Sequence, residues 1–275
     1  MNPIIDVSKH NGSIDWAKVK GNAQAAVIRM GYRGYHKGTL AIDSMYRENR
    51  QGCEAAGVPF SLYFFPCSIN DTEAEEEANL IIREAQGMVF YLPIFLDSEI
   101  SDPLHKGGRS DHLDRATRTH LLKLIIDKCQ GAGVPMGVYA STSWLENNLD
   151  MSQLPYSVWC AQYASKCKYT GSYMMWQYSS KGTISGVTGR VDVSVPHNPN
   201  DVGCPYKEPS KNVRYGDKGD SVKWVQWELV HRGFTLKVDG DFGELTLTAV
   251  RTFQTTASLE ADGIVGRKTR AAMLS

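Results

Sequence analysis

The stretch VFYLPIFLDSEISD, residues 89–102, is an apolar run that leads into two acids, Asp97 and Glu99. Such a run is typical of a buried strand, and side chains two positions apart on a strand point to the same face, roughly 6.5 to 7 Å apart along the chain. Two carboxylates this close repel each other, so one of them is expected to keep its proton above its ordinary pKa. The pair is therefore either a salt-bridged structural pair or an acid/base pair that does chemistry.

Eight apolar segments rich in Val, Ile, Tyr, Phe and Trp are predicted to be strands. They cover residues 4–8, 25–31, 58–65, 89–97, 134–141, 157–163, 173–179 and 190–195. Amphipathic segments at 43–57, 72–87 and 111–131 are predicted to be helices, whereas the segments after residue 150 leave little room for any. This order predicts an α/β fold, an irregular TIM-like (β/α) barrel over residues 1–197.

A change in composition predicts a second domain. Residues 198–212 are rich in Pro, Asn and Ser and are predicted to form an extended linker. Residues 213–275 are predicted to form a small all-α domain with an internal repeat, DGDFGELTLTAV (239–250) and DGIVGRKTRAAM (262–273). In each copy the glycines suit a tight turn and the Thr-x-x-Ala run starts a short helix. The acids in this region lack the spacing of an EF-hand, so no calcium site is predicted.

The bulk composition excludes several classes of protein. The formal net charge is zero and 42% of the residues are hydrophobic, so no overall field favours nucleic acid or a membrane surface. No apolar run reaches the length of a membrane span, and no membrane insertion is expected. The N-terminus lacks the pattern of a Sec-type signal peptide. We therefore expect a protein made in the cytoplasm that works there or leaves by another route.

The six cysteines form no C-x-x-C pair and have no companion His cluster. A zinc site is therefore not predicted, nor is any other metal or cofactor. Without a signal peptide, free buried thiols are the expected state. The formation of one disulfide after release of the protein stays an open alternative.

Chemistry on an α/β barrel is found at the C-terminal ends of the strands. Four acids on three strands are expected to meet at one mouth, namely Asp6, Asp97, Glu99 and Asp192. Aromatic and amide side chains near strand ends are candidates for substrate binding, namely Tyr63, Phe65, Tyr139, Gln162, Tyr163, Trp176 and Gln177. Acids surrounded by aromatic faces and amides suit a sugar polymer, whose apolar faces stack and whose hydroxyls and acetamides need polar partners.

Each of these residues also has a structural interpretation. Asp6 or Asp192 alone could cap a turn or a helix. The aromatic side chains could be core or rim packing. Asp97 and Glu99 could form an ion pair with an arginine such as Arg29 or Arg33, although their shared face favours an acid/base pair.

Several motifs occur in an order that resembles a known family. They include DVSKHNGSIDWAKVK, VIRMGYRG, AGVPFSLYFF, IFLDSE, GVYAS, WCAQY, MWQYSS and GVTGRVDVS. Over residues 1–197 the chain resembles the glycoside hydrolase family 25 lysozymes, the Chalaropsis-type muramidases. Residues 213–275 resemble the peptidoglycan-binding domain type 1. This combination is similar to phage endolysins and bacterial autolysins.

The resemblance implies hydrolysis of the β-1,4 bond between N-acetylmuramic acid and N-acetylglucosamine in bacterial peptidoglycan. It implies Glu99 as general acid, Asp97 as partner acid, and Asp6 and Asp192 as flanking carboxylates. Two routes stay open, a nucleophilic Asp97 or attack by the acetamide of the substrate, and both retain configuration. An enzyme of this kind would act on the wall after release through a lysis pore. A wall-binding protein without catalysis and a glucosaminidase are the alternatives.

Overall fold

The computed structural model describes residues 2–88, 90–102, 104, 107–154, 156–197, 206–230, 232, 234 and 236–274. The chain divides into two compact units, residues 1–202 and 203–275. Most of the predicted linker, residues 198–205, lies outside the described residues. No helix of the described parts is both long and apolar enough to span a bilayer.

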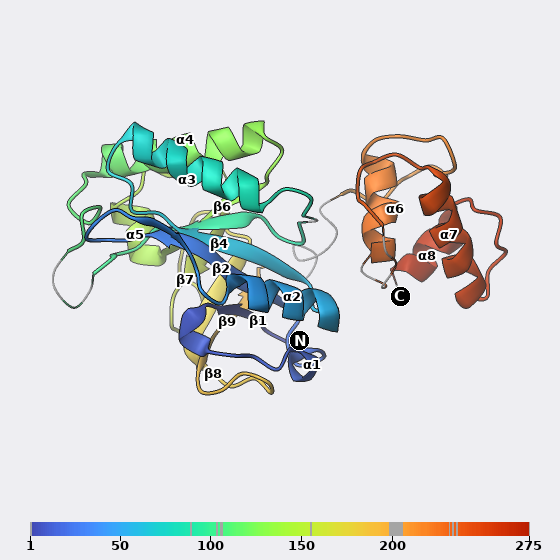
Figure 1. Ribbon diagram of the computed structural model, residues 1–275, viewed down its shortest axis with the longest axis horizontal. Helices are drawn as coiled ribbons and strands as arrows, with labels where there is room; N and C mark the ends of the chain where they lie inside the picture. Colours follow the sequence, from blue (N-terminus) through green and yellow to red (C-terminus); the bar gives the residue numbers. More distant parts are fainter. Residues whose placement is uncertain are drawn as a thin grey trace. The chain divides into compact units, whose positions relative to one another are not determined.

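The first unit is an eight-stranded closed barrel, so the predicted barrel fold is confirmed (Figure 1). Its strands are β1 (Ile4–Val7), β2 (Ala25–Arg33), β4 (Phe60–Phe65), β5 (Ile94–Asp97), β6 (Met136–Ser141), β7 (Ser157–Ala161), β8 (Met175–Gly182) and β9 (Val191–Pro196). A short strand that the sequence pattern did not predict, β3 (Leu40–Ile42), extends the sheet beyond β2. The order is β1-β9-β8-β7-β6-β5-β4-β2, and the β1–β2 pairing closes the barrel.

The barrel is irregular because its last strand runs the other way. Strands β1, β2 and β4 to β8 are parallel neighbours, whereas β9 is antiparallel to both β8 and β1. The antiparallel pair β8–β9 needs no crossover helix, which explains why the chain has room for these two strands in so few residues. The start of β9 therefore lies at the same end of the barrel as the C-terminal ends of the other strands.

Helices cover the outside of the strands in the first part of the barrel. They are α1 (Trp16–Val19), α2 (Tyr46–Ala56), α3 (Asp71–Glu84), α4 (Arg115–Gly131) and α5 (Thr142–Asn147). A short 3-10 helix, η1 (Lys9–Asn11), follows the end of β1. Helices α3 and α4 pack against each other (Figure 1). The helix α4 begins where Asp114 accepts a hydrogen bond of 2.8 Å from the Thr117 amide, as an N-cap does.

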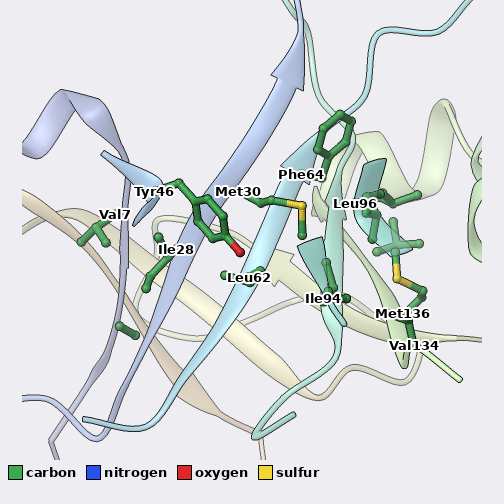
Figure 2. Packing of buried hydrophobic residues seen from close by; sticks show 14 of the residues in the cluster. Val7, Ile28, Met30, Tyr46, Leu62, Phe64, Ile94, Leu96, Val134 and Met136 are labelled. Atoms are coloured by element: carbon green, nitrogen blue, oxygen red, sulfur yellow. The ribbon is translucent and has the colours of Figure 1, made fainter. Parts of the chain in front are cut away.

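Alternation along the strands produces two apolar layers. Outward-facing side chains such as Ile28, Leu62 and Leu96 pack beneath the helices (Figure 2). Inward-facing side chains such as Phe95 and Trp159 fill the barrel interior. In β5 this alternation sends Phe95 and Asp97 inward. The strand is shorter than the predicted 89–97, because the chain from Phe90 to Pro93 is not in strand conformation.

In its described residues, the second unit contains three helices around its own core. They are α6 (Asp220–Val230), α7 (Glu244–Thr256) and α8 (Arg267–Met273). Their core includes Trp224, Val250 and Met273. The expected tight turns are present, since Gly240 and Gly263 have φ angles of 79° and 78°, which a residue with a side chain rarely adopts.

A buried glutamine closes each copy of the repeat. Gln254 Nε2 donates to Asp262 Oδ1 at 2.8 Å and to the Ile264 carbonyl at 3.0 Å, and its Oε1 accepts from the Gly263 amide at 2.9 Å. Gln226 makes the matching bonds around Gly240, at 2.9, 3.0 and 2.8 Å. The repeated D-G turn is thus specified by a side chain from the preceding helix.

We expect Gln254→Ala to destabilise the second unit by about 2 to 4 kcal/mol, since the buried amide of Gly263 and its neighbouring acceptors lose their partner. Calorimetry of the full chain should show an earlier transition for this unit. The exposed Thr252 on the same helix provides the control, because Thr252→Ala should leave that transition within about 2 °C. An unchanged transition for Gln254→Ala would show that the turn does not depend on the glutamine.

Candidate active site

Four carboxylates gather at the end of the barrel where the parallel strands finish. Asp6 on β1 and Asp192 on β9 are direct partners across the antiparallel pair, which places their Cβ atoms roughly 4.5 to 5.5 Å apart. Asp97 is the last residue of β5, and Glu99 follows two residues later. The charges of Asp192 and Glu99 both act on Asp6, so the four groups form one electrostatic cluster.

Two members of this cluster are buried. Asp6 is 8% exposed and Asp97 is 7% exposed. Burial is the main cause that raises the pKa of each, and the charge of Asp192 adds to the effect on Asp6 as that of Glu99 does on Asp97. Within the described part of the chain, Oδ1 of Asp97 has no hydrogen-bond partner. The cluster thus holds buried carboxyl groups that are not all ionised together at neutral pH.

Glu99 occupies the accessible position of the cluster. Its side chain is exposed at the mouth, yet the surrounding protein limits its solvation. This desolvation, together with the charge of Asp192, raises the pKa of Glu99 to about 7. A carboxyl group that is reachable and half-protonated near neutral pH has the properties of a general acid. Asp192 itself is half-buried, and burial raises its pKa.

Gln177 orients the buried half of the cluster. Its side chain is 2% exposed and its Nε2 donates to Asp6 Oδ2 at 3.0 Å. Its Oε1 accepts from the hydroxyls of Tyr139 at 2.9 Å and Tyr163 at 3.2 Å. These bonds fix which end of the amide faces Asp6, so Gln177 orients Asp6.

The aromatic candidates lie partly in the barrel interior and partly at the mouth. Tyr63 and Tyr139 belong to the interior layer, and burial raises the pKa of both, with the charge of Asp97 adding to it. Phe65 shares the face of Tyr63 on β4 by alternation. Tyr163 is 61% exposed, and its hydroxyl reaches Gln177 at the mouth.

Two of the predicted binding residues face elsewhere. Trp176 alternates with Gln177 on β8 and so lies on the outer face of the barrel, where its ring is 5.8 Å from that of Tyr178. Its indole donates to the Gln162 carbonyl at 2.8 Å. The Gln162 side chain accepts from the Lys168 amide at 2.6 Å within its own loop. Strand alternation and loop closure thus direct Trp176 and the Gln162 side chain away from Gln177 and Asp6, and a role of either in substrate binding stays a prediction.

The arginines named as alternative partners of the acid pair have other partners. Arg29 Nε donates to Asp43 at 2.7 Å, and Arg33 Nε donates to Glu77 at 2.8 Å. Across the described ranges, neither Asp97 nor Glu99 has a salt bridge to Lys or Arg. The structural ion pair is thus not observed, although the Arg29 charge partly offsets the rise in the pKa of Asp97.

The sequence pattern missed the residues that hold the segment after Glu99. Asp111 accepts hydrogen bonds from the amides of Ser101 at 2.8 Å and Gly108 at 2.7 Å. Arg118 donates to the Ser110 carbonyl at 2.9 Å. Trp144 Nε1 donates to Ser98 Oγ at 3.0 Å, directly before Glu99. The charged loop has no hydrophobic periodicity that would predict these contacts. They depend on Arg118 of α4 and Trp144 of α5, which only the folded structure brings to the loop.

Comparisons with known proteins agree with this architecture. The family model for glycosyl hydrolases family 25 matches residues 5–187, and a model for a peptidoglycan binding domain matches residues 218–273. An autolytic lysozyme from Clostridium acetobutylicum is 27% identical over 98% of this chain and 77% of its own length.

Solved structures show the same fold. The modular autolysin LytC from Streptococcus pneumoniae, in complex with a synthetic peptidoglycan ligand, has a TM-score of 0.63 and 29% identity. The match covers 71% of this chain and 46% of that one, so this chain spans less than half of that autolysin. The catalytic domain of endolysin ply40 from a Listeria monocytogenes bacteriophage has a TM-score of 0.59 at 24% identity, over 74% of this chain and 95% of that one. The chain therefore belongs to glycosyl hydrolases family 25, and it is a glycoside hydrolase with a C-terminal peptidoglycan-binding domain.

Proposed function

We propose that the protein is a muramidase, which hydrolyses the β-1,4 bond between N-acetylmuramic acid and N-acetylglucosamine in peptidoglycan. The observation that carries this proposal is the acid cluster, in which an accessible Glu99 with a pKa of about 7 lies beside the buried Asp97. Membership of family 25 and the similarity to an autolytic lysozyme support the substrate. The peptidoglycan-binding domain supports the same polymer.

Each acid of the cluster is assigned a proposed role in hydrolysis according to its position. Glu99, at the mouth, protonates the glycosidic oxygen as the bond breaks. Asp97, whose Oδ1 has no partner among the described residues, faces the positive charge that develops on the sugar ring. Asp192 favours the protonated form of Glu99 through its negative charge. Asp6, which receives a hydrogen bond from Gln177, lies next to this pair.

The proposed reaction retains configuration. Either Asp97 attacks the anomeric carbon and forms a glycosyl-enzyme, or the acetamide of the substrate attacks and Asp97 stabilises the oxazolinium ion. We favour the acetamide route, with Asp6 and Asp192 available to orient and polarise that group. Proton NMR of a short glycan during cleavage should show the β-anomer as the first product. An α-anomer formed first would contradict retention.

The class of reaction can be tested on purified walls. Digestion should release new reducing ends in step with the loss of turbidity, and no new free amino groups. Amino groups without reducing ends would place the cleavage in the peptide, and the proposal would fail. A family 25 protein that binds walls but releases neither group would be a binding protein only.

The pH dependence of hydrolysis follows from the raised pKa of Glu99. Activity should fall as the pH rises through about 7, because Glu99 then loses the proton that it donates. Asp192→Asn removes a negative charge that favours the protonated form, so this basic limb should move to lower pH by roughly 0.5 to 1 unit. Rates of peptidoglycan hydrolysis at constant ionic strength measure the shift.

The exposed N-cap Asp114 supplies the matched control, because asparagine caps a helix as well as aspartate does. Asp114→Asn should leave the basic limb where it is. A basic limb that stays in place in Asp192→Asn as well would show that Asp192 does not act on Glu99.

The second unit is proposed to tether the enzyme to the wall. Tethering raises the local concentration of enzyme at an insoluble polymer without adding catalytic contacts. A chain that ends at residue 202 should therefore lose about ten- to a hundredfold of its rate on whole walls, and less than about twofold on short soluble glycans. Each unit has its own apolar core, which makes the truncation practicable. Equal losses on both substrates would contradict the tether.

A further inference from the structure

Two thiols meet on the outer side of β7. Cys160 lies in the strand and Cys167 in the loop that follows it, and their Sγ atoms are 3.6 Å apart. Both are free thiols. A disulfide bond is about 2.0 Å long, so the two sulfurs need only a small approach to bond. The other described cysteines, Cys53, Cys67 and Cys129, are buried in the core.

The loop itself produces this contact. Gln162 Oε1 accepts a hydrogen bond of 2.6 Å from the Lys168 amide, which folds the chain back on itself after β7. Cys160 alternates with the inward-facing Trp159 and so points outward into the layer beneath the helices. The intervening residues 163–166 are exposed. The loop can therefore adjust without disturbing the core.

We propose that Cys160 and Cys167 form a thiol–disulfide pair that low-molecular-weight disulfides oxidise. The Cys167 thiolate attacks a small disulfide RSSR, which gives a mixed disulfide and releases one RSH. Cys160 then attacks the Cys167 sulfur, the S–S bond to R breaks, and the second thiolate leaves and takes up the proton of Cys160. Overall, two protein thiols and RSSR give one protein disulfide and two RSH.

The environment of each thiol sets this order. Cys167 is half-buried at the edge of the exposed loop, so a small disulfide can reach it. Cys160 is fully buried and its Sγ is 3.2 Å from Thr142 Oγ1. Burial also raises the pKa of Cys160 to about 12, which leaves it mostly protonated. Cys160 is therefore the resolving thiol and not the first to react.

The disulfide would restrain a residue at the mouth of the barrel. The loop that it closes carries Tyr163, whose hydroxyl is 3.2 Å from Gln177 Oε1. In the reduced form the loop is held by hydrogen bonds such as that from the Lys168 amide to Gln162 Oε1, and oxidation would add a covalent restraint to β7. The state of this pair would then follow the thiol–disulfide balance around the protein.

The full chain incubated with oxidised glutathione tests the proposal. After denaturation, alkylation and digestion, mass spectrometry should find a peptide in which Cys160 is linked to Cys167, and no glutathione on either. Cys160→Ser should instead accumulate one stable glutathione adduct at Cys167, since the resolving thiol is missing. In Cys167→Ser, Cys160 should stay a thiol. Free Cys160 and Cys167 in the wild type, or a link from either to another cysteine, would overturn the proposal.

Limited trypsin digestion measures the restraint on the loop. Lys166 and Lys168 are exposed on either side of Cys167, and cleavage there needs local opening of the loop. Oxidation should slow this cleavage at least about fivefold in the wild type and not at all in Cys167→Ser. Equal rates for the oxidised and reduced wild type would show that the bond restrains nothing.

Discussion

Replacing Glu99 by glutamine (Glu99→Gln) is expected to lower kcat/KM on peptidoglycan about a thousandfold or more. Glutamine has nearly the same shape as glutamate but no acidic proton. The glycosidic oxygen would therefore leave without being protonated, which makes it a poor leaving group. Glu99 is exposed at the mouth, and its replacement leaves the core of the barrel untouched. Binding to walls should therefore survive, which sedimentation of the variant with insoluble peptidoglycan would measure.

The matched control is Glu146→Gln, an identical change on the exposed face of α5. It should leave kcat/KM within about twofold of the wild type. If Glu99→Gln turned over at an ordinary rate, the proton donor would have to be another group. If both variants were inactive, the loss would not be specific to Glu99.

Replacing Asp97 by asparagine should abolish activity and stabilise the fold. The same thousandfold loss is expected, because the charge that faces the developing cation is gone. Burial raises the pKa of Asp97 above its unfolded value, so the folded state loses stability as the pH rises through the folded pKa. Asparagine cannot ionise and escapes this loss. The Tm of Asp97→Asn at pH 8 should exceed that of the wild type by about 2 to 4 °C, and the difference should shrink toward pH 4.

Asp43 provides the contrast for this stability effect. It is also buried, but its carboxylate bonds to Arg29 at 2.7 Å. Asp43→Asn leaves a nearly buried guanidinium without its counterion and should lower the Tm at pH 8. If the Tm of Asp97→Asn were also lower than that of the wild type, the Asp97 carboxylate would stabilise the fold. It would then not be a group that lowers the stability of the fold for the sake of function.

The barrel and the location of the acids could be predicted because they depend on local pattern. An apolar run that leads into Asp97 identifies both a strand and its functional end. Asp192 was placed correctly at the mouth for an incomplete reason. Its strand runs antiparallel, and its position near the strand start is what brings it opposite Asp6. Strand direction depends on the whole barrel, and no short pattern specifies it.

The contacts that the sequence did not predict are long-range or depend on alternation. Trp176 was assigned to the mouth although the inward position of its neighbour Gln177 sends it outward. The role of Gln177 toward Asp6 joins residues 171 positions apart. The hydrogen bond from Gln254 to Asp262 and the contact between Cys160 and Cys167 likewise depend on how a loop folds back on the preceding helix or strand. Composition and periodicity do not predict contacts of this kind.

The most direct test of a muramidase that uses Glu99 is the identity of the new reducing ends. Purified peptidoglycan would be digested with the wild type and with Glu99→Gln, reduced with borohydride and analysed by mass spectrometry. Muramitol ends from the wild type and none from the variant are the predicted result. Glucosaminitol ends would make the enzyme a glucosaminidase, and muramitol from the variant at the wild-type rate would show that Glu99 is not the proton donor.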